Sequence, residues 1–78
     1  MWYNNVMDFV VKQGEFEGPL DLLLQLVEKR KLFINDISLG TVTDEYLSHI
    51  QTLQINIDEK TEFVVIAAIL ILLKSRSL

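Results

Sequence analysis

The sequence predicts an all-α fold, a small domain of three helices preceded by an extended amino-terminal arm. Two stretches place apolar residues at the three- and four-residue spacing of a single helix face. A third stretch, residues 63–73, is apolar without a break. With 78 residues the chain is one domain at most. The hydrophobic core of so small a domain is only marginally sufficient to stabilise the fold on its own.

Composition excludes several classes of function. The chain has a net charge of −4 and shows no basic stripe with interleaved aromatic residues, so direct DNA binding is not expected. It has no cysteine, which excludes disulfides and thiolate metal sites and favours a cytoplasmic location. Residues 1–17 lack the pattern of a signal peptide and are predicted as an extended arm or, at residues 9–11, a single short edge strand.

The first helix is predicted to begin at Pro19, because proline suits the first helical position, where its missing N–H costs nothing. Asp21 adds a negative charge that the helix dipole favours in the first turn. Basic residues 29–31 close the helix, either as a solvated end, which we favour, or as a patch for an anionic partner. The apolar stripe comprises Leu20, Leu23, Leu24 and Val27, widened by Leu22 and Leu26.

The second helix is predicted from about Ser38 to Leu53, after a connection over residues 32–36. Asn35 and Asp36 in that connection are typical turn and cap residues. Gly40 weakens the first turn by about 1 kcal/mol relative to alanine. One helix face carries Leu39, Val42, Tyr46, Ile50 and Leu53.

The third helix is predicted from Glu59 to about Ser77, with Asp58 as its N-cap. Lys74 and Arg76 place positive charge at its far end, where the helix dipole favours it. Residues 54–57 break the preceding helical pattern.

The sequence offers no convergent catalytic groups, so we expect no enzymatic activity, no cofactor and no metal site. The single histidine, His49, could pair with Glu45 one turn earlier, but a metal normally needs three or four ligands. We therefore expect His49 to face solvent. No glycine-rich phosphate loop is present.

The apolar run of residues 63–73 would extend about 16 Å as a helix, roughly half of a bilayer core. Charged residues on both sides, Glu62 and Lys74, prevent its extension to a membrane span. Two amphipathic neighbours cannot cover a helix that is apolar on every side, which predicts that part of it binds another helix. The alternative is that residues 6–11 fold back over it and close the core.

Four motifs occur in order along the chain: FEGPLDLLL at residues 16–24, INDI at 34–37, TDEYL at 43–47 and LKSRSL at 73–78. With these motifs the chain resembles, over residues 9–78, the amino-terminal domain of segregation and condensation protein A (ScpA), the bacterial kleisin of the SMC condensin complex. It departs from the family at Ser38, where a proline is usual, and at Gly40, where an alanine-like residue is usual, so the start of the second helix is expected to differ.

The resemblance implies that residues 18–78 form the kleisin domain that binds the coiled-coil neck of an SMC ATPase and so contributes to chromosome condensation and segregation in cell division. Family members are much longer, and we expect their middle segment, which binds a dimeric accessory protein (ScpB), and their winged-helix domain to be absent here. The expected location is the cytoplasm, at the nucleoid through SMC, with no membrane contact.

The resemblance also assigns the neck-binding surface to the third helix and part of the second. The residues expected to contact the partner are Tyr46, Leu47, Val64, Val65, Ala67, Ala68, Ile71, Leu72, Lys74 and Arg76. Lys74 and Arg76 are expected either to pair with acidic residues of the neck or to be solvated. The alternative function is a helical module, unrelated to SMC, that self-associates through the third helix.

Overall fold

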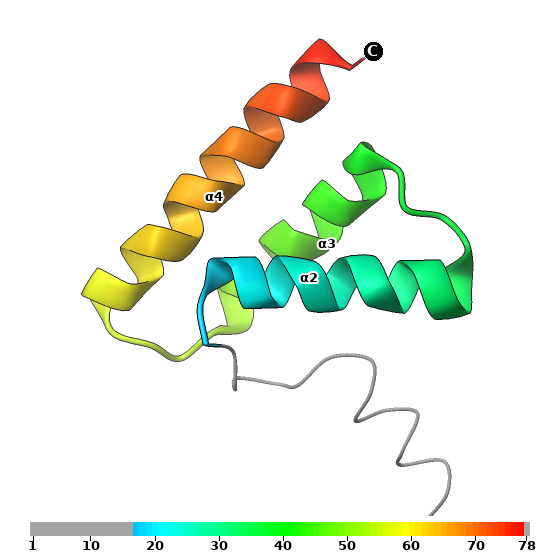
Figure 1. Cartoon of the computed structure of the whole chain (residues 1–78). Coiled ribbons are helices and arrows are strands. Elements are labelled where there is room, and N and C mark those ends of the chain that lie inside the picture. Colours follow the sequence, from blue (N-terminus) through cyan, green and yellow to red (C-terminus); the bar gives the residue numbers. More distant parts are fainter. Residues whose placement is uncertain (1–16, 78) are drawn as a thin grey trace, which may run out of the picture.

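The computed structural model describes residues 17–77, and these residues are helical with short connections (Figure 1). Helix α2 (Pro19–Lys29) runs into a π-helical turn, η1 (Arg30–Ile34), which is followed by α3 (Leu39–Thr52) and α4 (Ile57–Arg76). The described part of the chain contains no strand, in agreement with the all-α prediction. The predicted strand at residues 9–11, and the alternative in which residues 6–11 cover the third helix, lie outside the described residues.

Helix α2 begins as the sequence predicts, with Gly18 as N-cap and Pro19 in the first turn. The Asp21 carboxylate accepts a hydrogen bond from the backbone N–H of Glu17 at 3.1 Å, which ties the preceding residue to the start of the helix. Lys29 lies in the last turn. Asp21 in the first turn and Lys29 in the last therefore lie at the ends where the sequence prediction places them.

The chain stays helical beyond the predicted end of the first helix. The backbone N–H of Asn35 reaches the carbonyl of Arg30 at 2.6 Å, a spacing of five residues that closes the wide turn η1. Asn35 then takes the left-handed conformation, with φ of 60°, that ends many helices. The Asp36 carboxylate accepts the N–H of Ser38 at 3.1 Å, so both predicted turn residues act as expected.

The starts of the other two helices are fixed by side-chain caps. Ser38 Oγ accepts the N–H of Thr41 at 3.4 Å at the start of α3, close to the predicted boundary. Helix α4 starts two residues before the prediction, and the prediction of Asp58 as its N-cap is wrong. Asn56 caps this helix by accepting the N–H of Glu59 at 2.8 Å, and its amide also reaches the Glu59 carboxylate at 3.3 Å. This reciprocal arrangement resembles a capping box.

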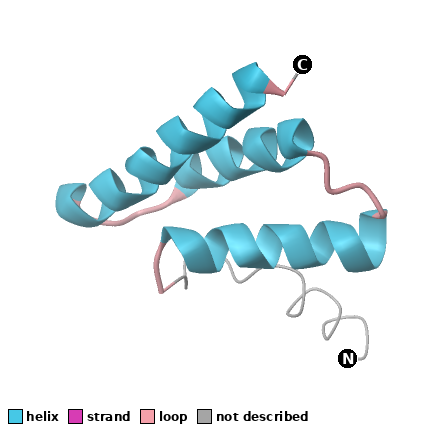
Figure 2. Cartoon of the chain, turned by 45° about the horizontal axis from the view of Figure 1, so that its top comes forward, coloured by secondary structure: helices cyan, strands magenta, loops and turns pink. Residues whose placement is uncertain are grey.

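The three α-helices enclose a small core. Figure 1 shows α3 behind α2, and Figures 1 and 2 both show α4 leaning away from α2 toward the carboxyl end of the chain. Helix α4 packs mainly against α3 and makes much less contact with α2. The buried cluster consists of Leu22, Leu26, Tyr46, Ile50, Leu53, Phe63, Ala67 and Leu70. Within the described residues, no helix combines the length and the apolar character needed to cross a bilayer.

Candidate partner-binding surface

Helix α4 turns only one narrow stripe toward the core. Phe63, Ala67 and Leu70, spaced four and three residues apart, are at most 6% exposed. Ile66 packs against the edge of this stripe and is partly buried. The inward face is therefore an ordinary i, i+4, i+7 face, although the sequence around the helix is apolar in every direction.

The remaining apolar side chains of α4 lie at the surface. Apart from Ile57 in the first turn, which is 82% exposed, the six large ones are between 46% and 52% exposed, although their positions are distributed around most of the helix. We call this set, with the exposed Ala68, the α4 outer surface: Val64, Val65, Ala68, Ile69, Ile71, Leu72 and Leu73. Contiguous exposed apolar surface of this kind marks interaction sites in soluble proteins.

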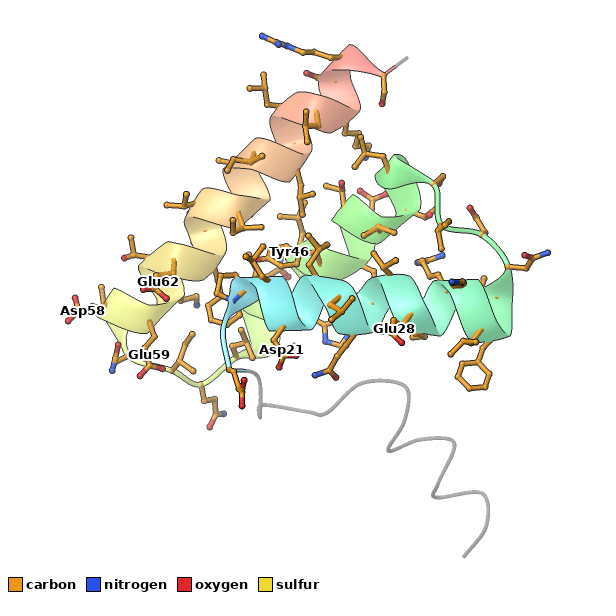
Figure 3. All side chains as sticks on the ribbon, viewed as in Figure 1. Asp21, Glu28, Tyr46, Asp58, Glu59 and Glu62 are labelled. Carbon is orange, nitrogen blue, oxygen red and sulfur yellow. The ribbon has the colours of Figure 1, made fainter. Side chains whose placement is uncertain are left out.

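Helix α2 extends this surface at its amino-terminal end. Leu20 and Leu24, one turn apart, are 66% and 56% exposed. Leu20 also lines a groove of about 590 Å³ between the start of α2 and the first half of α4, opposite Val65 and Ile66. Three acidic residues of the same groove are Glu17, Asp21 and Glu62, the last two labelled in Figure 3.

Three of the residues predicted to contact a partner do not lie on this surface. Tyr46 and Ala67 belong to the buried core, and Leu47 is partly buried against it. Tyr46 is held there by a hydrogen bond from its hydroxyl to the carbonyl of Phe63, and burial raises its pKa to about 12. The structure thus corrects where these side chains lie in the free chain. Val64, Val65, Ala68, Ile71 and Leu72 are exposed, and partner contact by them stays a prediction.

The two predicted basic contacts differ from each other. Lys74 bonds to the Asp44 carboxylate at 2.9 Å, so it joins α4 to α3 near the exposed end of the bundle. Arg76 is exposed and has no ion-pair partner among residues 17–77. Because the Lys74 pair is itself largely exposed, it contributes little to folding and does not prevent contact with a partner.

The basic end of α2 is not a solvated end, contrary to the favoured interpretation. Lys29 and Arg30 both bond to the Glu45 carboxylate of α3, the arginine at 2.8 Å. Burial raises the pKa of Glu45, but hydrogen bonds and charges from Lys29 and Arg30 outweigh it and lower the pKa below the usual value. Of the three basic residues, Lys31 is exposed.

His49 is half-buried rather than solvent-facing, which corrects the prediction. Burial lowers its pKa; the nearby Glu45 charge opposes this effect and the Lys29 charge adds to it. Among residues 17–77 there is no cluster of three or more side chains that could hold a metal ion. The histidine therefore belongs to the packing and charge network between α2 and α3.

Sequence reasoning missed two further groups of exposed apolar residues. The predicted apolar stripe of the first helix includes Leu20 and Leu24, but only its widening residues Leu22 and Leu26 are fully buried. The other group surrounds the π turn and comprises Leu32, Phe33, Ile34 and Ile37, all exposed. The signal in the sequence is the run of large apolar residues 32–34, which lies within the predicted connection over residues 32–36.

Comparisons with known proteins agree with one another. A family model described as segregation and condensation protein ScpA matches residues 26–78. The chain is 46% identical over 71 residues to segregation and condensation protein A of Exiguobacterium sibiricum, covering 90% of this chain and 28% of that protein. It is 42% identical over 74 residues to segregation and condensation protein A of Bacillus velezensis, covering 94% of this chain and 30% of that protein. It is 44% identical over 72 residues to segregation and condensation protein A of Myxococcus xanthus, covering 91% of this chain and 25% of that protein.

The chain thus spans less than a third of the length of each of these relatives. No solved structure matches it.

Proposed function

Because the chain belongs to the segregation and condensation protein A family, we propose that it acts as the neck-binding part of a non-enzymatic kleisin subunit. In this proposal residues 18–78 bind the coiled-coil neck of an SMC ATPase. The complex they join acts in chromosome condensation and segregation, at the nucleoid in the cytoplasm.

One observation carries the proposal: the α4 outer surface is apolar, exposed and helical over most of its length. A coiled coil offers two parallel rows of side chains against which a long helix packs to complete a bundle. Helix α4 has 20 residues, about 30 Å at 1.5 Å per residue, so it can follow a coiled coil over several turns. Because its side chain is small, Ala68 lets a partner helix approach closely near the middle of α4.

Helix α2 supports the same geometry. Leu20 lines the groove between α2 and α4, and Leu24 is exposed one turn farther along α2, so the two leucines add apolar surface at one end of the contact. A partner helix lying along α4 would cover this surface as well. Burial of apolar surface on α2 and α4 would supply most of the affinity. Each Å² of apolar surface buried contributes about 25 cal/mol of favourable free energy before the costs of association are subtracted.

The test is a calorimetric titration of an SMC head carrying its neck into the chain, with an SMC head lacking the neck as control. We expect saturable binding to the first and none to the second. Ile69→Glu should abolish this binding while circular dichroism shows unchanged helix content. Equal binding to both heads, or no binding to either, would overturn the proposal.

Light-scattering mass of the free chain tests the alternative of self-association through α4. A dimer that persists when the SMC neck is added in excess, with no heterocomplex, would favour that alternative. A monomer, or a dimer that the neck dissociates, supports the proposed function.

A further inference from the structure

We propose that the groove between the start of α2 and α4 receives a basic segment of the neck helix, one apolar side chain of which enters the groove between flanking lysine or arginine residues. This inference rests on the proposed function and adds the chemistry of the partner at one end of the contact. It assigns a distinct role to the acidic residues of the groove, separate from the apolar contact along α4.

Half of the residues that line the groove are apolar. Pro19 and Leu20 contribute from α2, and Val65 and Ile66 from α4, around a volume of about 590 Å³. The space is open to solvent and large enough for a leucine or methionine side chain. Leu20, with 66% of its surface exposed, and Val65, with 52%, gain the most from being covered.

The charged side chains that line the groove are all acidic. Glu17, Asp21 and Glu62 line it from both helices, and no basic side chain of the described residues does. Asp21 has a structural role as well, since its carboxylate accepts bonds from the Glu17 N–H and from the Gln25 amide at 3.3 Å.

Glu62 is the informative member of this group. It lies beyond the first turn of α4, which Asn56 and Glu59 already cap, so helix capping does not account for it. It is exposed and forms no ion pair within residues 17–77. Its carboxylate is therefore available in a groove that Val65 and Ile66 also line.

Covering this groove removes water from the carboxylates that line it, which is unfavourable unless cations take the place of that water. Lysine and arginine suit the position, because their aliphatic stems pack on an apolar surface while their charged ends reach a nearby carboxylate. A neutral or acidic segment would leave Glu62 unpaired. Charge complementarity therefore selects a basic segment of the partner and sets the register of α4 along the neck.

The experiment compares Glu62→Lys with Glu28→Lys in binding to the SMC head with its neck. Glu28 is the matched control, since it is exposed and lies farther along α2, outside the groove (Figure 3). Glu62→Lys should weaken binding by about tenfold or more through like-charge contact, and Glu28→Lys by less than about twofold. Glu62→Gln should weaken binding less than Glu62→Lys does. It should also make binding to the neck less dependent on salt concentration than it is in the wild type.

A charge swap then identifies the partner residue. Lysine or arginine positions of the neck are changed one at a time to glutamate, and one of them should restore binding to Glu62→Lys. Equal affinities for the Glu62→Lys and Glu28→Lys variants, with wild-type binding intact, would overturn the groove inference and leave the proposed function standing. Absence of wild-type binding would instead overturn the proposed function.

Discussion

The hydroxyl of Tyr46 donates a hydrogen bond to the main-chain carbonyl of Phe63 across 2.8 Å, deep between α3 and α4. The tyrosine side chain is fully buried and Phe63 is 5% exposed. A buried hydroxyl needs a partner, so this bond favours one rotation of α4 about its own axis. That rotation decides which apolar residues of α4 enter the core and which form its outer surface.

Replacement of Tyr46 by phenylalanine should lower the free energy of unfolding by about 1 kcal/mol, the usual net worth of one hydrogen bond. The ring stays and fills the same space, so helix content should not change. Urea titration followed by circular dichroism measures the loss. An unchanged midpoint would show that the bond adds nothing to stability.

The same tyrosine should ionise late. Burial raises its pKa from 10.0 to about 12, so its contribution to stability is present below pH 10 and is lost as the pH rises through 12. Ultraviolet titration of the chain, which has two tyrosines, should show a late component. This component should be missing in the Tyr46→Phe variant.

Neighbouring alanines should respond oppositely to glutamate. Ala67 is 4% exposed, so Ala67→Glu buries a carboxylate without a partner and should unfold the free chain at a cost of several kcal/mol. Ala68 is exposed, so Ala68→Glu should leave helix content intact and abolish SMC binding. Circular dichroism and the calorimetric titration separate the two effects. If both variants unfold, the α4 outer surface is not a free surface.

The carboxylates of Asp44 and Glu45 should contribute different amounts to the free energy of unfolding. Glu45→Gln leaves Lys29 and Arg30 with a weaker, neutral partner in a half-buried site, and should cost about 2 kcal/mol. Asp44→Asn disturbs only the exposed pair with Lys74 and should cost less than about 0.5 kcal/mol. Thermal unfolding of the two variants measures this difference, and equal losses would contradict the role given to Glu45.

Acidification should destabilise the domain in two stages. The pKa of His49 is lowered from 6.5 by folding, so its contribution is present above pH 6.5 and is lost as the pH falls below that value. The pKa of Glu45 is also lowered, from 4.5, so its contribution is lost at still lower pH. Melting temperatures measured against pH should fall over both ranges, and His49→Gln should remove the first stage alone.

The three helices and most of their ends could be predicted from the sequence, because each rests on local chemistry. Pro19 and Ser38 act through their own backbone neighbours, and the stripe of α3 has a single apolar face. The cap of α4 was misassigned because Asn56 and Asp58 are both good cap residues. Only the position of the following Glu59, three residues after Asn56, distinguishes them.

The division of α4 into inner and outer faces could not be predicted, because a helix that is apolar all round carries no pattern to orient it. Its orientation depends on nonlocal contacts, chiefly the bond from Tyr46 to Phe63. The bonds from Lys29 and Arg30 to Glu45 could not be predicted for the same reason, since Glu45 lies 16 and 15 residues farther along the chain.

The wide turn η1 gives the chain a place where its length can change during evolution. The bond from Asn35 to Arg30 encloses one residue more than an α-helical turn does, and the apolar side chains there are exposed. Loss of one residue converts the turn into an ordinary one and keeps its left-handed exit. The same deletion in α4 would rotate every later residue by about 100° and move Leu70 out of the core. Descendants of one ancestral gene can therefore gain or lose a residue at this turn while α4 keeps its spacing.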